Sequence, residues 1–251
     1  MHEYTYEQIE ELRKCMKDVV YFAETYCKVI HPIKGLISLE LYPHQKEVLK
    51  ALADNDLNIF LACRQSGKTV AQNCFLLWYS NFSTIPKTNM LISNKQSSAA
   101  NILDDIYIMY ENLPDWMKIK LTVKTKLCME FETGTTIRGM HMHKQVGQGE
   151  ALSSIFFDEC AYYNKKEFKE LWISLYPIIC TGGKVCLTSS ASKADGIFYE
   201  TWIDAIEGKN DFKAMEIKWS DIPGRDGQWA DTVIKNIGDE CFQREFLNKF
   251  V

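Results

Sequence analysis

The chain has 251 residues, of which 46% are hydrophobic and 25% charged. These values are ordinary for a globular protein, exclude a disordered, collagen-like or coiled-coil chain, and predict one large domain or two small ones. The formal net charge is -4. The chain therefore lacks the overall basic character of many nucleic-acid-binding proteins, and any DNA contact must come from a local patch.

The first elements predicted along the chain are helical. Thr5 and Gln8 have the spacing of a capping box. An amphipathic stripe at helical spacing follows, formed by Ile9, Leu12, Met16, Val19 and Ala23. Residues 34–42 look like a loop, and Pro43 stands where a further helix over 45–52 could begin. We therefore expect a helical N-terminal extension over residues 1–35.

From residue 58 onward, apolar strand-like runs alternate with helical patterns. Strands are predicted at 58–62, 89–93, 154–157, 184–188 and 212–219, and helices at 68–78, 97–112, 164–179 and 196–206. Residues 127–131 and 136–140 alternate with period two around Thr133-Gly134, which predicts a β-hairpin insertion. Two short helical stretches flank Gly238. This alternation predicts one α/β domain with a mostly parallel central sheet flanked by helices.

Cysteine spacing and the N-terminus bear on the cellular compartment. The nine cysteines include no C-x-x-C pair, which favours buried thiols in a reducing compartment over a zinc or redox site. The N-terminal sequence has no apolar core of a signal peptide, and no apolar run is long enough to span a membrane. We expect a cytosolic protein.

The sharpest chemical signal is the stretch A-C-R-Q-S-G-K-T, from Ala62 to Thr69. It matches the phosphate-loop pattern G-x-x-x-x-G-K-[ST] except at the first glycine, which is Ala62 here. A strand is predicted before it and a helix after it, as the pattern requires. Lys68 can reach the β- and γ-phosphates of a nucleotide, and the Thr69 hydroxyl can hold Mg²⁺. A chance Gly-Lys-Thr at a helix start is the alternative.

The strand-like run S-I-F-F-D-E carries the second signal, because it ends in Asp158 and Glu159. An acid at the carboxyl end of a strand lies at the ligand-binding edge of an open α/β sheet. Asp158 can hold Mg²⁺, and Glu159 can orient and deprotonate an attacking water. Solvated acids at a strand end are common, but the phosphate loop upstream favours the functional interpretation.

Two weaker signals accompany these. Thr188, Ser189 and Ser190 end another apolar strand, where hydroxyl groups could sense a γ-phosphate, although such ends are usually turns. Gln45 could bond the edge of adenine, or could be an exposed glutamine at a helix start.

Two further groups have simpler explanations. A small basic face, by default solvated but able to contact DNA, is formed by Lys165, Lys166 and Lys169. The pair Tyr162-Tyr163 is better explained by packing in the core or at its rim than by base stacking.

Together, the motifs LYPHQKEVL, ACRQSGKT, IFFDECAYY, LTSSAS and FYETWIDAIEG resemble the ATPase domain of large terminase subunits, the DNA-packaging motors of tailed bacteriophages, and most of all the T4-like branch. The resemblance covers residues 36–251. It implies a P-loop NTPase fold of the ASCE type, with the acid strand between the phosphate-loop strand and its neighbours. It also implies Mg²⁺-dependent ATP hydrolysis that drives double-stranded DNA into a procapsid.

The resemblance also implies a role for each motif residue. Residues 36–220 would form the P-loop core and residues 221–251 a C-terminal helical subregion. The implied roles are adenine recognition by Gln45, nucleotide binding by Cys63, Arg64, Gln65, Ser66, Gly67, Lys68 and Thr69, metal binding by Thr69 and Asp158, catalysis by Glu159, Lys68 and Arg64 as an arginine finger in cis, and coupling by Thr188, Ser189 and Ser190.

Two departures from the family pattern bear on these roles. Family members often carry Arg-Gly shortly before the acid pair, and that arginine is a candidate finger acting on a neighbouring subunit. The position here reads Gln148-Gly149, which leaves Arg138 and Arg225 as candidates in trans. Full large terminases continue into a nuclease domain, and this chain stops where that domain should begin. We therefore expect an isolated ATPase domain without nuclease activity.

The partners implied by the resemblance are double-stranded DNA, a portal protein, a small terminase subunit and further copies of the chain in a pentameric ring, all in the host cytoplasm and away from membranes. One rival interpretation is a fragment of a helicase of the two-RecA-domain type, which shares the glutamine, GKT, Asp-Glu and Ser/Thr motifs. Another is a non-catalytic assembly module that docks on a portal or small terminase through the N-terminal amphipathic helix.

Overall fold

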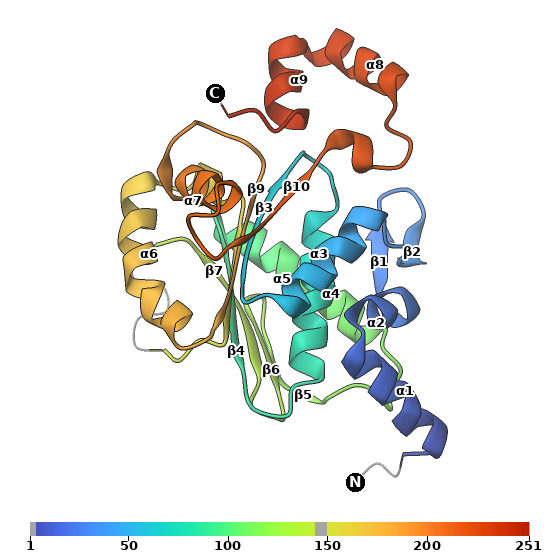
Figure 1. Cartoon of the computed structure of the whole chain (residues 1–251). Helices are drawn as coiled ribbons and strands as arrows, with labels where there is room; N and C mark the ends of the chain where they lie inside the picture. Colours follow the sequence, from blue (N-terminus) through green and yellow to red (C-terminus); the bar gives the residue numbers. More distant parts are fainter. Residues whose placement is uncertain (1–3, 144–149, 251) are drawn as a thin grey trace.

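A computed structural model describes residues 4–143 and 150–250 of the chain. Its centre is an eight-stranded sheet with the order β10-β3-β9-β8-β4-β7-β6-β5 (Figure 1). Six strands run parallel: β3 (Leu57–Ala62), β4 (Thr88–Ser93), β7 (Thr136–His141), β8 (Ser154–Asp158), β9 (Lys184–Ser189) and β10 (Lys213–Ile217). The predicted mostly parallel α/β fold is confirmed, and the loops that follow these strands gather at one edge of the sheet.

The strand order corrects one expectation. The acid strand β8 pairs with β9 and β4, and β9 pairs in turn with the phosphate-loop strand β3. The acid strand therefore does not neighbour the phosphate-loop strand, because the strand ending in Thr188-Ser189 lies between them. Pairing order depends on how the crossover helices lie, and no local sequence pattern reports it.

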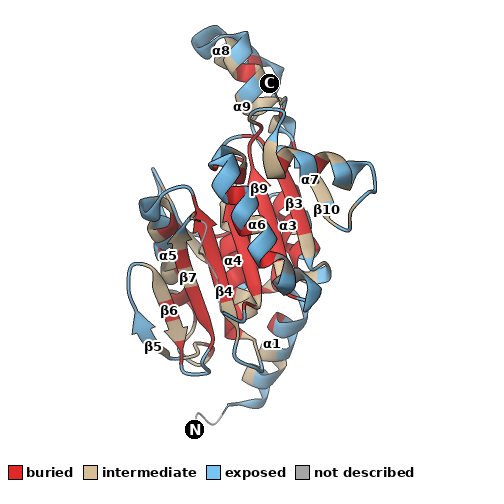
Figure 2. Ribbon diagram, turned by 90° about the vertical axis from the view of Figure 1, so that its left-hand side faces the viewer, coloured by how far each residue is buried: buried red, intermediate tan, exposed pale blue. Residues whose placement is uncertain are grey.

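Helices cover both faces of the sheet (Figure 1). On one face lie α3 (Pro43–Asp54), α4 (Lys68–Asn81) and α5 (Gln96–Glu111), and on the other α6 (Lys165–Cys180) and α7 (Gly196–Ile206). Along β3, Phe60 faces the first group of helices, whereas Ile59 and Leu61 face the second. Figure 2 shows the central strands as buried. Burial on both faces explains why these strands read as continuous apolar runs.

The predicted hairpin insertion is present at the other end of the sheet. Strand β6 (Cys128–Phe131) pairs antiparallel with β7, and Gly134 turns between them at φ +79°. A further edge strand, β5 (Leu121–Lys124), pairs antiparallel with β6 and was not predicted. Three of its four residues are exposed, so it lacks the apolar alternation that identifies a strand.

The N-terminal extension differs from the single helix that its stripe predicts. Asp18 has an extended backbone and separates α1 (Tyr6–Lys17) from α2 (Val19–Tyr26), and its carboxylate accepts hydrogen bonds from the backbone N–H groups of Val20 and Tyr21. The capping box of Thr5 and Gln8 is confirmed. Strands β1 (Lys28–His31) and β2 (Gly35–Ser38) then pair in a small antiparallel sheet. The extension is thus only partly helical.

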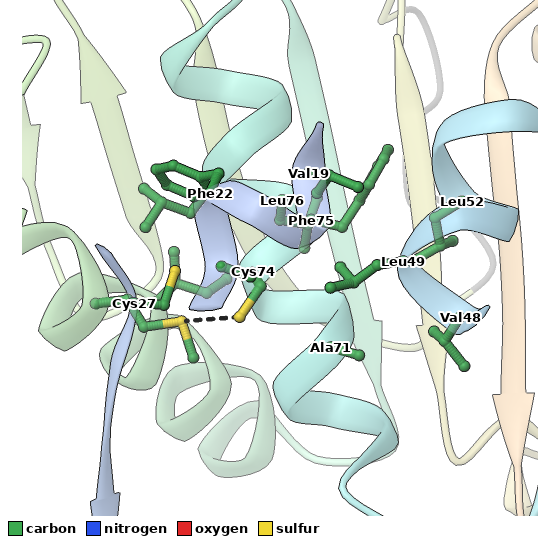
Figure 3. Packing of buried hydrophobic residues seen from close by; sticks show 14 of the residues in the cluster. Val19, Phe22, Cys27, Val48, Leu49, Leu52, Ala71, Cys74, Phe75 and Leu76 are labelled. Atoms are coloured by element: carbon green, nitrogen blue, oxygen red, sulfur yellow. Dashed lines mark hydrogen bonds between the residues drawn. The ribbon is translucent and has the colours of Figure 1, made fainter. Parts of the chain in front are cut away.

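This extension packs on the helix that follows the phosphate loop (Figure 3). Phe22 and Cys27 lie against Cys74 and Phe75 of α4, with the thiols of Cys27 and Cys74 in contact. The hydrogen bond with Cys74 and burial raise the pKa of Cys27, so this thiol stays protonated. The extension therefore helps to fix the helix on which the candidate site is built.

The C-terminal helices lie beyond the loop edge of the sheet (Figure 1). After β10, a short 3-10 turn (Trp219–Asp221) leads to α8 (Gly227–Ile237) and α9 (Asp239–Phe246), which meet at Gly238 as predicted. Aromatic rings join these segments, with Trp219 stacked on Trp229 at 5.6 Å between centroids. Within the described ranges, no helix combines the length and apolarity needed to cross a membrane.

Candidate active site

The phosphate loop, residues 63–67, joins β3 to the first turn of α4. Gly67 adopts φ +76°, a conformation that other residues rarely accept, and a Cβ there would collide with the side-chain amide of Gln45. Gln65 also has a positive φ of 55°. The retained glycine of the motif is therefore required on two counts, by its backbone conformation and by its contact with Gln45.

Two side chains of α3 contact backbone carbonyls of the loop. The amide of Gln45 donates to the carbonyl of Gly67 at 3.0 Å and accepts from the backbone N–H of Tyr42 at 2.9 Å. His44 Nε2 lies 2.7 Å from the carbonyl of Ser66. Gln45 is only 4% exposed, so it is not an exposed glutamine at a helix start. Its role in adenine recognition stays a prediction, and the observed contacts give it a role in shaping the loop.

The C-terminal subregion also contacts the loop, through hydrogen bonds and an ion pair. Arg225 donates to the carbonyls of Arg64 and Gln65 at 3.2 and 3.1 Å, and its guanidinium lies 4.8 Å from the ring centroid of Trp229. The backbone N–H of Arg64 donates to the carbonyl of Glu245 at 3.0 Å, and the two side chains form an ion pair. A residue considered for action in trans thus contacts the phosphate loop of its own chain.

Arg138, the other candidate in trans, lies away from this cluster. It is on β7, a strand whose neighbours are β4 and β6, and it pairs with Glu150 at 2.8 Å. Gln148 and Gly149, which stand where the family often has Arg-Gly, lie outside the described residues.

Lys68 and the acid pair come together as predicted. Lys68 Nζ lies 2.6 Å from Glu159 Oε1. Burial lowers the pKa of Lys68, but Glu159 and Asp158 outweigh it and raise this pKa overall. Burial likewise raises the pKa of Glu159, but the charge of Lys68 outweighs it and lowers this pKa. Burial raises the pKa of Asp158 to about 6. Two adjacent carboxylates therefore differ in proton affinity, with Glu159 the more readily ionised.

The turn at Glu159 is strained and held by the neighbouring strand end. Glu159 adopts φ 54°, unusual for a residue other than glycine. Its second carboxylate oxygen lies 3.4 Å from the hydroxyls of Ser189 and Ser190. The Thr188 hydroxyl donates to the carbonyl of Phe157 at 3.2 Å. Two of the three predicted coupling residues, Ser189 and Ser190, thus contact Glu159 directly, and the backbone strain lies at the carboxylate that the motif marks as catalytic.

A cavity of about 680 Å³ opens between these groups. Asp158 and Glu159 line it, together with Arg64, Gln65, Ser93, Asn94, Lys95, Ser98, Tyr162 and Phe246. Tyr163 is buried and donates to the carbonyl of Ile92, as packing predicts. Tyr162 instead faces the cavity, with its hydroxyl 3.1 Å from that of Ser190.

Sequence reasoning did not find several of these residues. Glu245 was not singled out, and Arg225 was considered only for a role in trans, because both reach the loop through the path of the C-terminal helices. Lys95 and Ser98 could have been suspected, because they follow the apolar strand β4 just as Glu159 follows β8.

The fold is similar to that of solved large terminases. The HK97 bacteriophage large terminase superposes with a TM-score of 0.75 at 15% identity, over 94% of this chain and 55% of that chain. The Thermus phage P74-26 large terminase ATPase domain gives 0.61 at 18% identity, over 81% of this chain and 93% of that one. The large terminase of a thermophilic bacteriophage gives 0.64 at 15%, over 85% and 54%. The chain spans about half the length of the two whole large terminases.

At these identities the solved structures show a shared fold alone, the P-loop α/β fold of ASCE type. The sequence itself carries the assignment further. Residues 59–251 match the family described as terminase large subunit, T4likevirus-type, N-terminal. Since this match takes in the phosphate loop, the acid pair, the Ser/Thr strand end and the C-terminal helices, the chain belongs to the large terminase subunits of the T4-like type.

Proposed function

We propose that this site hydrolyses ATP with the help of Mg²⁺ and that hydrolysis drives double-stranded DNA into a viral procapsid. The observation that carries the proposal is the 2.6 Å contact between Lys68 and Glu159, which joins the end of the phosphate loop to the acid strand beside the cavity that Glu159 lines. Family membership supports it, as does a large terminase of a thermophilic bacteriophage that has been solved with ADP and with ATP-gamma-S.

The residues present fit a divalent cation. Asp158 is 8% exposed, and its Oδ1 is a buried oxygen with no hydrogen-bond partner among the described residues. An oxygen of this kind is a ligand that Mg²⁺ prefers. Asp158 and the Thr69 hydroxyl, one residue beyond Lys68, would hold the ion. When bound, Mg²⁺ would neutralise charge on the β- and γ-phosphates.

Lys68 and Glu159 would change partners during the reaction. Phosphate oxygens would take the Lys68 ammonium away from Glu159, and the freed carboxylate could then orient a water molecule. Glu159 would accept a proton from this water. At the same time the oxygen of the water would bond to the γ-phosphorus, and the bond between the γ-phosphorus and the bridging oxygen that leaves with ADP would break. The loss of Lys68 would remove the main cause that lowers the pKa of Glu159, so the freed carboxylate would be a stronger base.

Arg64 is the finger that the site favours in cis. Its guanidinium lines the cavity, and its side chain is 57% exposed even while it pairs with Glu245. Charge that develops on the γ-phosphate would be stabilised by a positive group held there. Thr188, Ser189 and Ser190, which contact the acid strand and its turn, would pass the loss of phosphate to the rest of the sheet.

The partners belong to the same proposal. A motor of this family would act in the host cytoplasm, docked on a portal protein, together with a small terminase subunit and as a pentameric ring of identical subunits. The net charge of -4 suits such an arrangement, because weak non-specific attraction to DNA would leave docking to the portal as the step that brings the motor to its substrate.

The test is the ATPase rate per molecule across a series of protein concentrations. Glu159→Gln should abolish turnover while nucleotide still binds, and Glu170→Gln, at an exposed position on α6, is the matched control and should be as active as the unchanged chain. A rate that rises with concentration indicates a residue supplied in trans, and a flat rate indicates Arg64 in cis. Full activity of Glu159→Gln would overturn the assignment. Strand separation on forked DNA would favour a helicase, and failure to bind ATP would favour an assembly module.

A further inference from the structure

The edge of the sheet farthest from β10 carries a concentration of positive charge. Between Trp116 and Cys128 the sequence contains four lysines and no acidic residue, although the whole chain has a net charge of -4. The lysines are Lys118, Lys120, Lys124 and Lys126. They lie on and beside β5, the exposed outer strand of the sheet (Figure 2).

Two of these lysines have no acidic group within ion-pair distance among the described residues. Lys118 pairs with Asp115 at 3.1 Å, and Lys124 lies 3.8 Å from Asp104. Lys120 and Lys126 are exposed, and no ion pair of the described chain includes either of them. Lysines on an edge strand also discourage pairing with another strand. That explanation accounts for Lys120 beside β5, but not for Lys126, which lies beyond the strand in the turn to β6.

Lys126 belongs to a second cavity, of about 500 Å³, beside the candidate active site. Its wall on α5 carries donor side chains at helical spacing beside apolar surface. The lining residues are Gln96, Ser97, Ala100, Asn101 and Asp104 of α5, with Lys126 and Leu127. Amide, hydroxyl and ammonium groups are the side chains that contact the phosphate and sugar backbone of DNA. The one acid in the lining, Asp104, faces Lys124.

The two cavities lie on either side of a single helical turn. Lys95 and Ser98 line the candidate active site, whereas Gln96, Ser97 and Asn101 line the second cavity. α5 begins directly after β4, which pairs with the acid strand β8. A shift of this turn caused by nucleotide in the first cavity would therefore move the donor side chains that line the second.

We propose that this surface, formed by the second cavity and the lysines of β5, is where the chain contacts the backbone of double-stranded DNA. The proposal rests on the proposed function. We choose DNA over an acidic protein as the occupant for two reasons. Small polar donors and ammonium groups without an ion pair recognise a repeating phosphate. A protein partner needs apolar anchors, and the apolar residues of the lining are only Leu127 and Ala100.

The test compares two double substitutions of equal charge. Lys120→Glu with Lys126→Glu removes the unpaired charges, and Lys166→Glu with Lys169→Glu does the same on the exposed face of α6. Each pair takes the net charge from -4 to -8, because two positive residues become negative. Affinity for a labelled duplex is measured by fluorescence anisotropy across a range of salt concentrations.

We expect the first pair to weaken DNA binding by about tenfold or more at low salt and to reduce the slope of log affinity against log salt by about 1 to 2, since each phosphate contact contributes about 0.9. The α6 pair should lose much less. Equal losses in the two pairs, a larger loss in the α6 pair, or no measurable binding by the unchanged chain would each overturn the proposal. So would affinity for polyglutamate that depends on Lys120 and Lys126 as strongly as affinity for DNA.

Binding of a fluorescent ATP analogue in the same samples separates this proposal from the proposed function. If DNA binding depends on the patch while no variant binds nucleotide, the DNA surface stands and the ATPase proposal fails. If nucleotide binds normally and the two pairs lose DNA affinity alike, the ATPase proposal stands and the DNA surface fails.

Discussion

The guanidinium of Arg225 donates to the backbone carbonyl of Gln65 at 3.1 Å, although the two residues are 160 positions apart in the chain. A second hydrogen bond reaches the carbonyl of Arg64. In a phosphate loop the N–H groups point toward the anion, so a donor on the carbonyl side supports the loop without competing for substrate. The last helices of the chain therefore help to set the shape of a loop encoded near its beginning.

Arg225→Ala should weaken ATP binding and destabilise the protein by about 1 kcal/mol, because two hydrogen bonds from a charged group to exposed backbone carbonyls are lost. Arg225→Lys should recover only part of both, since a single ammonium cannot reproduce the planar fork of guanidinium. Thermal melting and titration with a fluorescent ATP analogue measure the two effects. Arg13→Ala, an exposed arginine on α1, is the control. Arg225→Ala with native affinity but no stimulation by added subunits would instead indicate a role in trans.

Glu245→Gln should tighten ATP binding, because it removes the carboxylate that holds the Arg64 side chain. The pair is partly exposed, so it stabilises the present position of Arg64 by at most about 1 kcal/mol. Its loss should therefore raise the affinity for ATP by about fivefold at most. The measurement is the KM for ATP at low and high salt, and the gain should shrink as salt screens the pair in the unchanged chain. The same gain in an Arg64→Ala background would show that Glu245 acts by another route.

Gly67→Ala should destabilise the protein more than Gly224→Ala. Both glycines have positive φ, +76° and +82°, but a Cβ at Gly67 meets the amide of Gln45 whereas nothing lies within 4 Å at Gly224. Backbone strain alone costs about 1 to 2 kcal/mol, so the difference between the two variants isolates the collision. Thermal melting measures it. If Gln45→Ala combined with Gly67→Ala fails to recover the difference, the contact with Gln45 is not its cause.

Asp158→Asn should stabilise the protein at neutral pH in the absence of nucleotide and metal. The pKa of Asp158 is raised from 3.8 to about 6, so the folded protein binds this proton more tightly than the unfolded chain. The stability from this group is fully present below about pH 4 and is lost as the pH rises through about 6. The cost above pH 6 is at most about 3 kcal/mol.

Melting temperatures between acid and neutral pH in a chelating buffer measure this effect. The Asn variant should lose part of the pH dependence, and Asp231→Asn, at an exposed position on α8, should keep all of it. With Mg²⁺ and nucleotide present the order should reverse, because the unchanged chain then gains the ion. An Asn variant that melts lower than the unchanged chain at neutral pH in chelator would contradict the conclusion that the buried charge of Asp158 destabilises the fold.

Much of the site could be predicted because its residues lie directly after buried strands. Lys68 follows β3 and its loop, Glu159 follows β8, and Ser190 follows β9. In a parallel sheet the carboxyl ends of strands meet at one edge, so three local patterns are enough to place three parts of a site in one place.

What could not be predicted depends on contacts with no local pattern. A helical stripe continues through Asp18 in sequence, but the carboxylate of Asp18 caps the following helix instead of continuing the first one. An amide such as that of Gln45 can bond the edge of adenine, but in the structure it is hydrogen-bonded to the backbone of Gly67 and Tyr42. Glu245 reaches Arg64 from α9, which packs on α8 through contacts such as that of Trp229 with Phe246, and no local pattern reports this packing.

The position of β9 between β3 and β8 has a consequence for product release. Neighbouring strands lie about 4.8 Å apart, so one intervening strand holds the phosphate-loop strand and the acid strand about 9 to 10 Å apart. That gap suits a phosphate group, and in the structure the contact of Lys68 with Glu159 closes it. The chain thus carries its own anionic competitor for the lysine. A triphosphate with several further contacts can outcompete this carboxylate, whereas a lone inorganic phosphate has little else to hold it and is displaced.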